Sequence, residues 1–312
     1  MFKASVIIPT YNRPLELKNC IKSILEQTVK PYELIVVDDG NLSELPVKKE
    51  CQEKGIHYIY LKKDKPGLTE SRNKGIGLAS GDIIFFFDDD VVLFPDYISE
   101  ILSIYQNDKD GIVGGVGGEV VNRKPLKIRT CLRRLFDIFF LVTGFNEGKV
   151  LPSGFCVNYG DTEFTIKKIK KVDFLSGGVC SFRKEVFKEF LFNTEKYLGY
   201  GLGEDIEFSY RVSKKYTLIF NPKARLLHLD SPKMSIDDMR EGRMYMMNRY
   251  IFFNKYVKKG WWSWLFFYYA LFGYVSIRII SLIILPRREK AGELKGYFLA
   301  FGDILKGNIR VE

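Results

Sequence analysis

Short apolar runs that alternate with helical segments dominate the first 120 residues, and this rhythm limits the possible folds more than any other feature. Pro14 opens one predicted helix, whose apolar residues recur on one face, and LTESRNKGIGLAS (68–80) forms a second. A β-α-β-α-β order predicts a doubly wound parallel α/β sheet with right-handed crossovers. The predicted buried strands, β-rich and followed by polar turns, are ASVIIPT (4–10), ELIVVDDG (33–40), HYIYL (57–61) and DIIFFFD (82–88).

Aspartates stand where two of these strands end: Asp38 and Asp39 in the second, and Asp88, Asp89 and Asp90 after IIFFF. Ligands of such sheets bind outside the carboxyl ends of the strands, so we expect these carboxylates to converge on one crevice. Three adjacent carboxylates repel one another unless something offsets their charge. Alternation along the chain sends Asp88 and Asp90 to the same side, where they can share a hard divalent cation. A solvated turn or a helix cap is the competing interpretation. No Gly-x-x-x-x-Gly-Lys loop occurs, which excludes P-loop phosphate binding.

The composition is that of a folded protein, with 46% hydrophobic and 28% charged residues among 312. The formal charge of +10 is uneven, because residues 231–312 contain 14 Lys and Arg against 7 Asp and Glu. A basic excess fits nucleic acid, an anionic membrane surface or phosphorylated substrates. The five cysteines lack C-x-x-C spacing, which predicts reduced thiols in a cytosolic setting. The first apolar run breaks too soon for a signal peptide.

Beyond residue 110 the pattern loosens, and we expect a mixed extension of the sheet with loops that cover the crevice. After residue 230 a basic amphipathic helix (239–260) precedes 25 residues, 261–285, whose only charge is Arg278. A helix of that length would run about 37 Å, longer than the ~30 Å hydrocarbon core. Clustered tryptophans beside lysines favour anchoring at the membrane interface. In-plane or re-entrant contact, a true span, and a buried core or dimer contact all remain open. A further amphipathic helix is predicted over 293–308.

Six motifs occur in an order that resembles the family 2 glycosyltransferases of the GT-A fold, over residues 4 to about 230. They are SVIIPTYNRP, ELIVVDDG, SRNKGI, FFFDDDVV, FLSGGVCSFR and GEDIEF. The resemblance implies a Rossmann-like mixed sheet flanked by helices, with a C-terminal helical membrane-associating region. It implies a catalytic domain at 1–230, with a nucleotide-binding half (1–120) and an acceptor-binding half (121–230), followed by a membrane-associated region at 231–312.

The resemblance also assigns donor-binding and metal-binding roles. Asp38 would accept from the nucleoside base, Arg72 would approach the base or diphosphate, and Asn73 would brace that loop. Asp90 would bind Mn²⁺ or Mg²⁺ bridging the two phosphates, with Asp88 contacting the ribose or sugar and sharing the metal site. The remaining donor-binding positions are Pro9, Thr10, Tyr11, Asp39 and Asp89.

Inverting transfer needs a base that deprotonates the acceptor hydroxyl. The family pattern makes Asp205 that base and Glu204 a supporting acceptor contact; as local structure alone, both are helix-capping acids. Gly177 and Gly178 would let an acceptor sugar approach the backbone, or simply form a turn. His228 is a metal or diphosphate ligand in the family pattern and a core histidine otherwise. Arg240 and Arg243 would clamp the diphosphate or form a solvated basic face.

The implied activity is a metal-dependent, inverting transfer from a UDP-, GDP- or dTDP-linked sugar to an acceptor hydroxyl. The acceptor is expected to be a lipid-linked or other membrane-associated glycan, and the enzyme to sit on the cytoplasmic face of the cell membrane, peripherally or through one helix. A homodimer remains open. The alternatives are a sugar-nucleotide pyrophosphorylase, a basic nucleic-acid-binding protein and a membrane scaffold. A pyrophosphorylase would need a glycine-rich loop after the first strand, which this sequence lacks. No nucleic-acid-binding motif is present, and the complete set of acidic positions argues against a scaffold without activity.

Overall fold

The computed structural model describes residues 2–42, 47–122, 128–159, 168–195, 202–229 and 237–309, with the backbone alone at 128–131. The chain forms two compact units. The first comprises Met1–Arg123 and Ile166–Pro232, and the second comprises Lys124–Thr165 and Lys233–Glu312.

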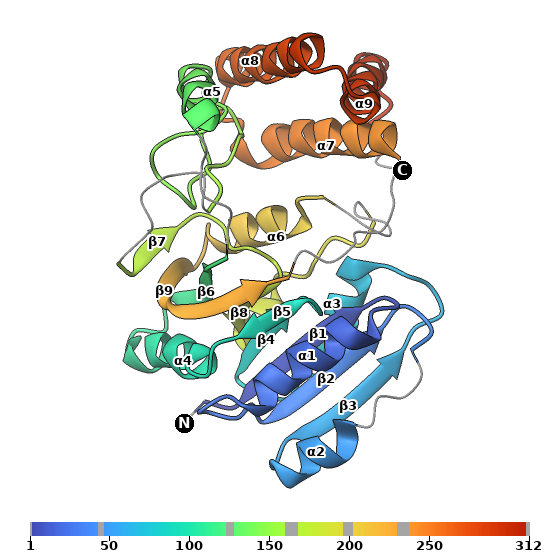
Figure 1. The fold of residues 1–312 in the computed structure, drawn as a ribbon. Coiled ribbons are helices and arrows are strands. Elements are labelled where there is room, and N and C mark those ends of the chain that lie inside the picture. The colour runs from blue at the N-terminus through green and yellow to red at the C-terminus, as the bar shows by residue number, and fades with distance from the viewer. Residues whose placement is uncertain are drawn as a thin grey trace. The chain divides into compact units, whose positions relative to one another are not determined.

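The first unit is built on one mixed sheet with the strand order β3-β2-β1-β4-β8-β6-β9-β5, and β7 pairs with β9 beside this path (Figure 1). The pairs β3-β2, β2-β1, β1-β4 and β6-β9 are parallel, and the other pairs are antiparallel. The strands are β1 (Ala4–Thr10), β2 (Glu33–Asp38), β3 (His57–Lys62), β4 (Ile83–Phe87), β5 (Val91–Leu93), β6 (Val113–Val120), β7 (Lys170–Val172), β8 (Val179–Arg183) and β9 (Thr217–His228). The predicted parallel half and its mixed extension are both confirmed.

Helices complete this unit, and the two predicted between the first strands are confirmed. Pro14 is the first residue of α1, whose predicted apolar face is buried, with Leu17, Cys20 and Ile21 fully inaccessible. The second predicted helix ends two residues early, at Leu78. The helical segments are α1 (Pro14–Leu25), α2 (Val47–Glu53), α3 (Leu68–Leu78), α4 (Tyr97–Asn107), the 3-10 turn η1 (Lys184–Lys188) and α6 (Glu204–Val212).

The period of two along the strands supplies both faces of the sheet with apolar side chains. Val6 and Phe85 belong to one large core that also contains the buried residues of α1 and α4. On the alternate positions, Ile7 closely faces Gly75 of α3, and Phe86 packs edge-on against Phe182. The residues of β1, β2 and β4 are buried throughout, and the aspartates lie at the carboxyl ends of β2 and β4.

The second unit, in the described residues, is helical (Figure 1). Its core contains Phe155, Met246, Phe253 and Phe267. Gly154, at φ 78°, lets the backbone pass close to the Phe253 ring, because an added Cβ would lie 3.0 Å from that side chain. The helices are α5 (Ile128–Phe139), α7 (Asp238–Phe252), the π-helical turn η2 (Phe253–Val257), α8 (Ser263–Ile284) and α9 (Arg288–Leu305).

The compact units and the division expected from the sequence differ in one segment. Residues 124–165 were expected in the acceptor-binding half, whereas they cluster with the C-terminal helices. The physical reason is packing: Phe140 contacts Tyr269 and Phe272 of α8, and Phe155 contacts Tyr274. Single apolar side chains in a loosely patterned segment do not reveal such partners.

Candidate active site

The three aspartates directly follow β4, between β1 on one side and β8 on the other. Asp89 and Asp90 are buried, at 5% and 6% exposure, while the Asp88 side chain is 35% exposed. The competing interpretation of a solvated turn is therefore wrong for Asp89 and Asp90. Each carboxylate instead has partners of its own, drawn from separate parts of the chain.

Asp89 faces the end of β1. Thr10 donates its hydroxyl to Asp89 Oδ2 at 2.7 Å, and the Arg13 guanidinium lies 3.1 Å from Oδ1. The same Arg13 nitrogen lies 3.3 Å from Asp90 Oδ2, so one cation holds two adjacent carboxylates. Burial nevertheless raises the pKa of Asp89 to about 6, against the opposing effects of Thr10 and Arg13. Asp89 therefore contributes to the framework of the cluster.

Asp88, Asp90 and His228 form a group whose potential ligand atoms all lie within 4.8 Å of one another. His228 Nε2 is 3.6 Å from Asp88 Oδ2 and 3.6 Å from Asp90 Oδ1. The antiparallel pairing of β5 with β9 brings them together, because Val91 is in register with His228. Asn122 exchanges two hydrogen bonds with the His228 backbone, at 2.8 and 3.0 Å, and so fixes that strand end.

The electrostatics of this group suit a cation. Burial raises the pKa of Asp88, but the hydrogen bond from His228 and the charge of Arg72 outweigh it and hold that pKa below its ordinary value. The hydrogen bond to Asp88 raises the pKa of His228, while burial raises that of Asp90. Two carboxylates and one imidazole are oxygen and nitrogen donors that Mn²⁺ and Mg²⁺ sites use. The donor set fits the predicted metal.

Arg72, on α3, is almost completely buried and connects the aspartates to a second pair of acids. Its guanidinium lies 3.0 Å from Glu204 Oε1 and 3.5 Å from Asp88 Oδ1, and it stacks over Phe192 at 5.3 Å. Its Nε is buried without a hydrogen-bond partner among the described residues. The charges of Glu204 and Asp88 raise the pKa of Arg72 against the effect of burial. A fixed cation therefore separates the two acidic groups.

Glu204 and Asp205 begin α6, as expected for acids in a first helical turn. Burial and the neighbouring Asp205 raise the pKa of Glu204 to about 7. Burial also raises the pKa of Asp205, although Arg72 and two backbone amides oppose this. These amides are Gly177 N–H, which donates to Oδ2 at 2.9 Å, and Ile206 N–H, which donates to Oδ1 at 2.8 Å. The carboxylate is thereby held in one orientation.

Gly177 and Gly178 are tightly packed against this machinery. A Cβ on Gly178 would lie 1.9 Å from Asp88 Oδ2, and one on Gly177 would lie 2.8 Å from the Cβ of Asp205 and 2.9 Å from Arg72. Both glycines are thus required by the site's own side chains, a reason distinct from the predicted approach of an acceptor. Much of the glycine-rich stretch at 197–203 lies outside the described residues.

Asp38 and Asp39 are engaged within the chain. Asp38 is fully buried and accepts from Gly40 N–H at 2.8 Å and from the Tyr60 hydroxyl at 2.7 Å. Asp39 lies 3.0 Å from Lys63 Nζ and accepts from Ser71 at 2.5 Å. These bonds hold the turn after β2 and the start of α3. The contact predicted between Asp38 and a nucleoside base stays a prediction.

The remaining donor-side positions surround the end of β1. Pro9 and Thr10 are buried, while Tyr11 is 39% exposed. Asn12 has a left-handed φ of 54°, and its Oδ1 accepts from Asn41 N–H at 2.9 Å, which joins the turns after β1 and β2. Among Pro9, Thr10 and Tyr11, Tyr11 is therefore the side chain that is accessible to a ligand.

The remaining predicted residues are two arginines and Asn73. Arg240 and Arg243 belong to α7 in the second unit, where Arg243 is paired with Asp303 at 2.8 Å. Asn73, expected to brace a donor-side loop, lies within α3 and exchanges hydrogen bonds of 2.8 and 3.1 Å with the Phe192 backbone.

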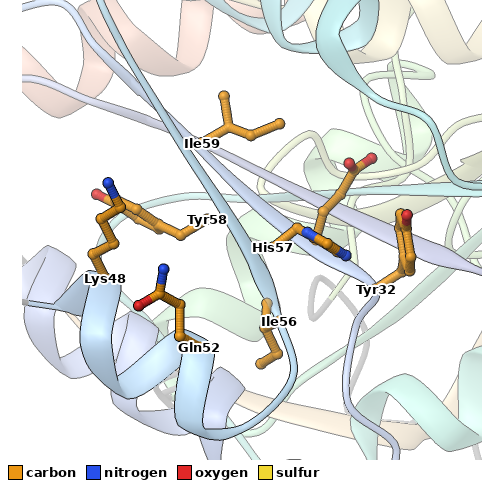
Figure 2. A pocket seen from close by; sticks show the side chains of 8 residues that line it. Tyr32, Lys48, Gln52, Ile56, His57, Tyr58 and Ile59 are labelled. Carbon is orange, nitrogen blue, oxygen red and sulfur yellow. The ribbon is translucent and has the colours of Figure 1, made fainter.

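A pocket of about 320 Å³ lies at the opposite ends of β2 and β3. Figure 2 shows the residues that line it, and Glu33 and His57 are the first residues of these two strands. Asp38 and Lys62 are the last residues of the same strands. The pocket is therefore separate from the aspartate cluster, and His57 has no part in that cluster.

Sequence reasoning missed Arg13 and Lys63. Both follow parallel strands, β1 and β3, at the edge where the aspartates were expected to meet. Their position after these strands could have identified them as partners of the aspartates, since buried carboxylates at a strand end require cations nearby.

Comparison with known proteins gives a consistent result. The family model described as "Glycosyl transferase family 2" matches residues 5–191. The glucosyl-dolichyl phosphate glucuronosyltransferase of Haloferax volcanii is 34% identical over 130 residues, which are 39% of this chain and 41% of that enzyme. The chain thus aligns with less than half the length of this relative.

Two solved structures show the fold. Staphylococcus aureus TarS (residues 1–349) superposes with a TM-score of 0.58 and 13% identity, covering 98% of this chain and 92% of that one. The mannosyltransferase PcManGT of Pyrobaculum calidifontis, in complex with GDP-Man and Mn²⁺, gives a TM-score of 0.52 and 16% identity, covering 97% and 80%. The predicted GT-A fold is confirmed.

Proposed function

The chain belongs to glycosyl transferase family 2, and we propose that it is a metal-dependent, inverting enzyme that moves a sugar from a nucleotide-sugar donor to a lipid-linked or other membrane-associated glycan. The family match favours glycosyl transfer over the pyrophosphorylase, nucleic-acid-binding and scaffold alternatives. One observation carries the finer proposal: a metal-ligand set, Asp88, Asp90 and His228, is joined through Arg72 to a buried acidic pair at the start of α6.

On the donor side, Asp88, Asp90 and His228 would hold Mn²⁺ or Mg²⁺. When bound, the divalent cation would offset the negative charge of the departing nucleotide diphosphate. Arg13 keeps Asp89 and Asp90 together, and Arg72 adds a fixed positive charge beside Asp88. The exposed Tyr11 is the side chain at the end of β1 best placed to contact a nucleoside, while the internally bonded Asp38 and Asp39 support the adjoining loops.

On the acceptor side, Asp205 would act as the base. Its carboxylate is held by two backbone amides, and its raised pKa makes it a better proton acceptor than an ordinary aspartate. In the reaction the acceptor oxygen would bond to the anomeric carbon as its proton passes to Asp205. The bond from that carbon to the diphosphate oxygen breaks, and the nucleotide diphosphate leaves with the electron pair. Glu204 positions the guanidinium of Arg72, with which it is paired, and contacts the acceptor.

A membrane-associated acceptor is supported by two observations. The Haloferax relative is named for a dolichyl-phosphate-linked substrate. In this chain, α8 is long and apolar enough to enter a membrane, with a mean hydropathy of 1.7. The proposed location is the cytoplasmic face of the cell membrane, in keeping with the predicted reduced cysteines. Among the described side chains, Cys20, Cys51, Cys156 and Cys180 form no disulfide.

The test begins with a thermal-shift screen of UDP-, GDP- and dTDP-sugars with and without Mn²⁺, because a true ligand stabilises the folded state. Asp90→Ala should abolish the Mn²⁺-dependent shift. Asp205→Asn should preserve that shift and reduce turnover by about a hundredfold or more. Asp110→Ala, an exposed turn residue, serves as the control and should change neither quantity.

Two results would contradict the proposal. If a nucleotide sugar shifted the melting temperature equally in EDTA and in Mn²⁺, the proposed metal dependence would be wrong. If Asp205→Asn turned over at the wild-type rate, the assignment of Asp205 as the base would be wrong.

A further inference from the structure

The helix α8 exposes an apolar face along its whole length. Leu265, Phe272 and Ile283 are 66%, 65% and 75% exposed, and Tyr269 and Ile279 lie on the same side at helical spacing. A stripe of this size, over a helix of about 33 Å, is far more apolar surface than a water-exposed helix normally presents.

The opposite face of α8 is packed inside the second unit. Phe267, Ala270 and Leu271 are buried in its core. The hydroxyls of Tyr274 and Tyr297 lie 3.3 Å apart, and Lys290 donates to the Ser281 hydroxyl at 2.7 Å. Both contacts join α8 to α9, the first near the middle of each helix and the second between the end of α8 and the start of α9. The charged residues of α9 are Arg288, Glu289, Lys290, Glu293, Lys295 and Asp303.

This packing is incompatible with α8 crossing a bilayer as a single helix. Lipid would have to surround α8, so either its buried face would lose its partners or the charged α9 would enter the hydrocarbon with it. Each charged side chain at the centre of a bilayer costs several kcal/mol. A helix with one packed and one exposed apolar face instead fits the interface plane, with the exposed face in the acyl region.

The helix α5 extends the same face. Leu132, Leu135 and Phe139 are 72%, 63% and 68% exposed, at the i, i+3 and i+7 positions of one side. Tyr269 of α8 donates its hydroxyl to the Phe139 carbonyl at 3.1 Å, and the rings of these two residues lie 6.1 Å apart. Figure 1 shows α5 beside α8 within this unit.

The junction of the two helices is close. An added Cβ on Gly273 would lie 2.2 Å from the Phe140 ring, so this glycine lets α5's end seat against the α8 backbone. The exposed apolar side chains of α5 and α8, defined here as the α5–α8 face, are therefore one continuous surface.

Basic residues border this face at both ends of α8. Lys258 and Lys259 precede the helix, Arg287 and Arg288 follow it, and all four are exposed. Arg133 on α5 adds a side chain that is 38% exposed. Positive charge around an apolar surface complements anionic lipid headgroups.

We propose that the α5–α8 face inserts into one leaflet of an anionic membrane, with α8 lying in the plane of that leaflet and α5 inserted beside it. This deepens the membrane association within the proposed function and chooses between the orientations that the sequence left open. Its test measures binding to lipid and not sugar transfer, so either proposal can fail without the other.

The first experiment is sedimentation of the full chain with vesicles of phosphatidylglycerol and phosphatidylcholine, compared with phosphatidylcholine alone. We expect tighter binding to the anionic vesicles, weakened by salt. The double variant Leu135→Glu with Phe139→Glu should bind at least about tenfold more weakly, because two inserted apolar side chains are replaced by charges. Ile112→Glu, a 50% exposed position in the first unit, should bind like wild type. Circular dichroism and the nucleotide-sugar thermal shift establish that the variants are folded.

The second experiment determines the orientation. Lys259→Cys and Arg287→Cys flank α8, and each protein is added to preformed vesicles before a membrane-impermeant maleimide. An in-plane helix leaves both cysteines equally reactive from the outside, whereas a spanning helix protects one of them and overturns the proposal. Wild-type vesicle binding by the folded α5 double variant would also overturn it. So would light scattering that shows the wild type as a dimer and the double variant as a monomer, because a second copy would then cover the face.

Discussion

Replacing Arg72 with methionine tests how the site tolerates its buried acids. Arg72 is the cation between Asp88 and Glu204. Its charge opposes the rise in pKa of Glu204 and Asp205, and it helps to hold the pKa of Asp88 below its ordinary value. Methionine retains much of the apolar contact with Phe192 but removes the charge and the hydrogen-bond donors. The acids would then be buried with less compensation.

The expected cost depends on pH, and the direction follows from linkage. Without Arg72, the folded-state pKa of Glu204 and of Asp205 rises further above the unfolded value. A carboxyl group whose folded-state pKa is raised contributes its full stabilisation at pH values below its unfolded pKa. That stabilisation is lost as the pH rises through the folded-state pKa. Glu204 already has a pKa of about 7, so at pH 5.5 it is mainly protonated with or without Arg72. We expect Arg72→Met to cost about 1–2 kcal/mol at pH 5.5, for the lost hydrogen bond and packing. At pH 8.5 the cost should reach about 3–5 kcal/mol, because ionised acids lose a buried partner.

The assay is urea unfolding of wild type and variant at pH 5.5 and 8.5, with EDTA present so that no metal contributes. Lys74→Met is the matched control on the same helix, since Lys74 is half exposed and lies 3.5 Å from Glu70; it should cost less than about 1 kcal/mol at either pH. A cost for Arg72→Met that is equal at the two pH values, or larger at pH 5.5, would refute the electrostatic role given to Arg72.

Two further predictions concern the same site. Glu204→Gln removes a carboxyl group whose pKa of about 7 exceeds its ordinary value of 4.5. Wild type should therefore lose stability relative to this variant between pH 5 and 8, by up to about 3 kcal/mol. A stability difference between the two proteins that stays constant across that pH range in melting experiments would disprove it. Gly178→Ala places a Cβ where Asp88 Oδ2 lies, so it should weaken Mn²⁺ binding in calorimetric titration by about tenfold or more, whereas Gly77→Ala, with open space around it, should not.

Much of the first unit is readable from local pattern. The period of two in the strands and the one-sided helix after Pro14 are set by neighbouring residues, and both occur where expected. The order of the strands places Asp38 and Asp88 at the same edge, because parallel strands share their carboxyl ends. The motifs then sufficed to identify the family.

Long-range pairing accounts for the contacts that residue patterns alone could not supply, although the family resemblance had already named His228 as a metal or diphosphate ligand. His228 reaches Asp90 because β9 runs antiparallel to β5, and Arg72 meets Glu204 across 132 positions of the chain. The packing of Phe140 on α8 likewise assigns segment 124–165 to the helical unit.

Residue types and their periodicity thus specify which segments fold as strands and helices, and at which edge the acids emerge. Which distant cation, glycine or histidine meets each acid depends on the register of strands far apart in sequence, and a one-dimensional pattern carries no direct record of that register.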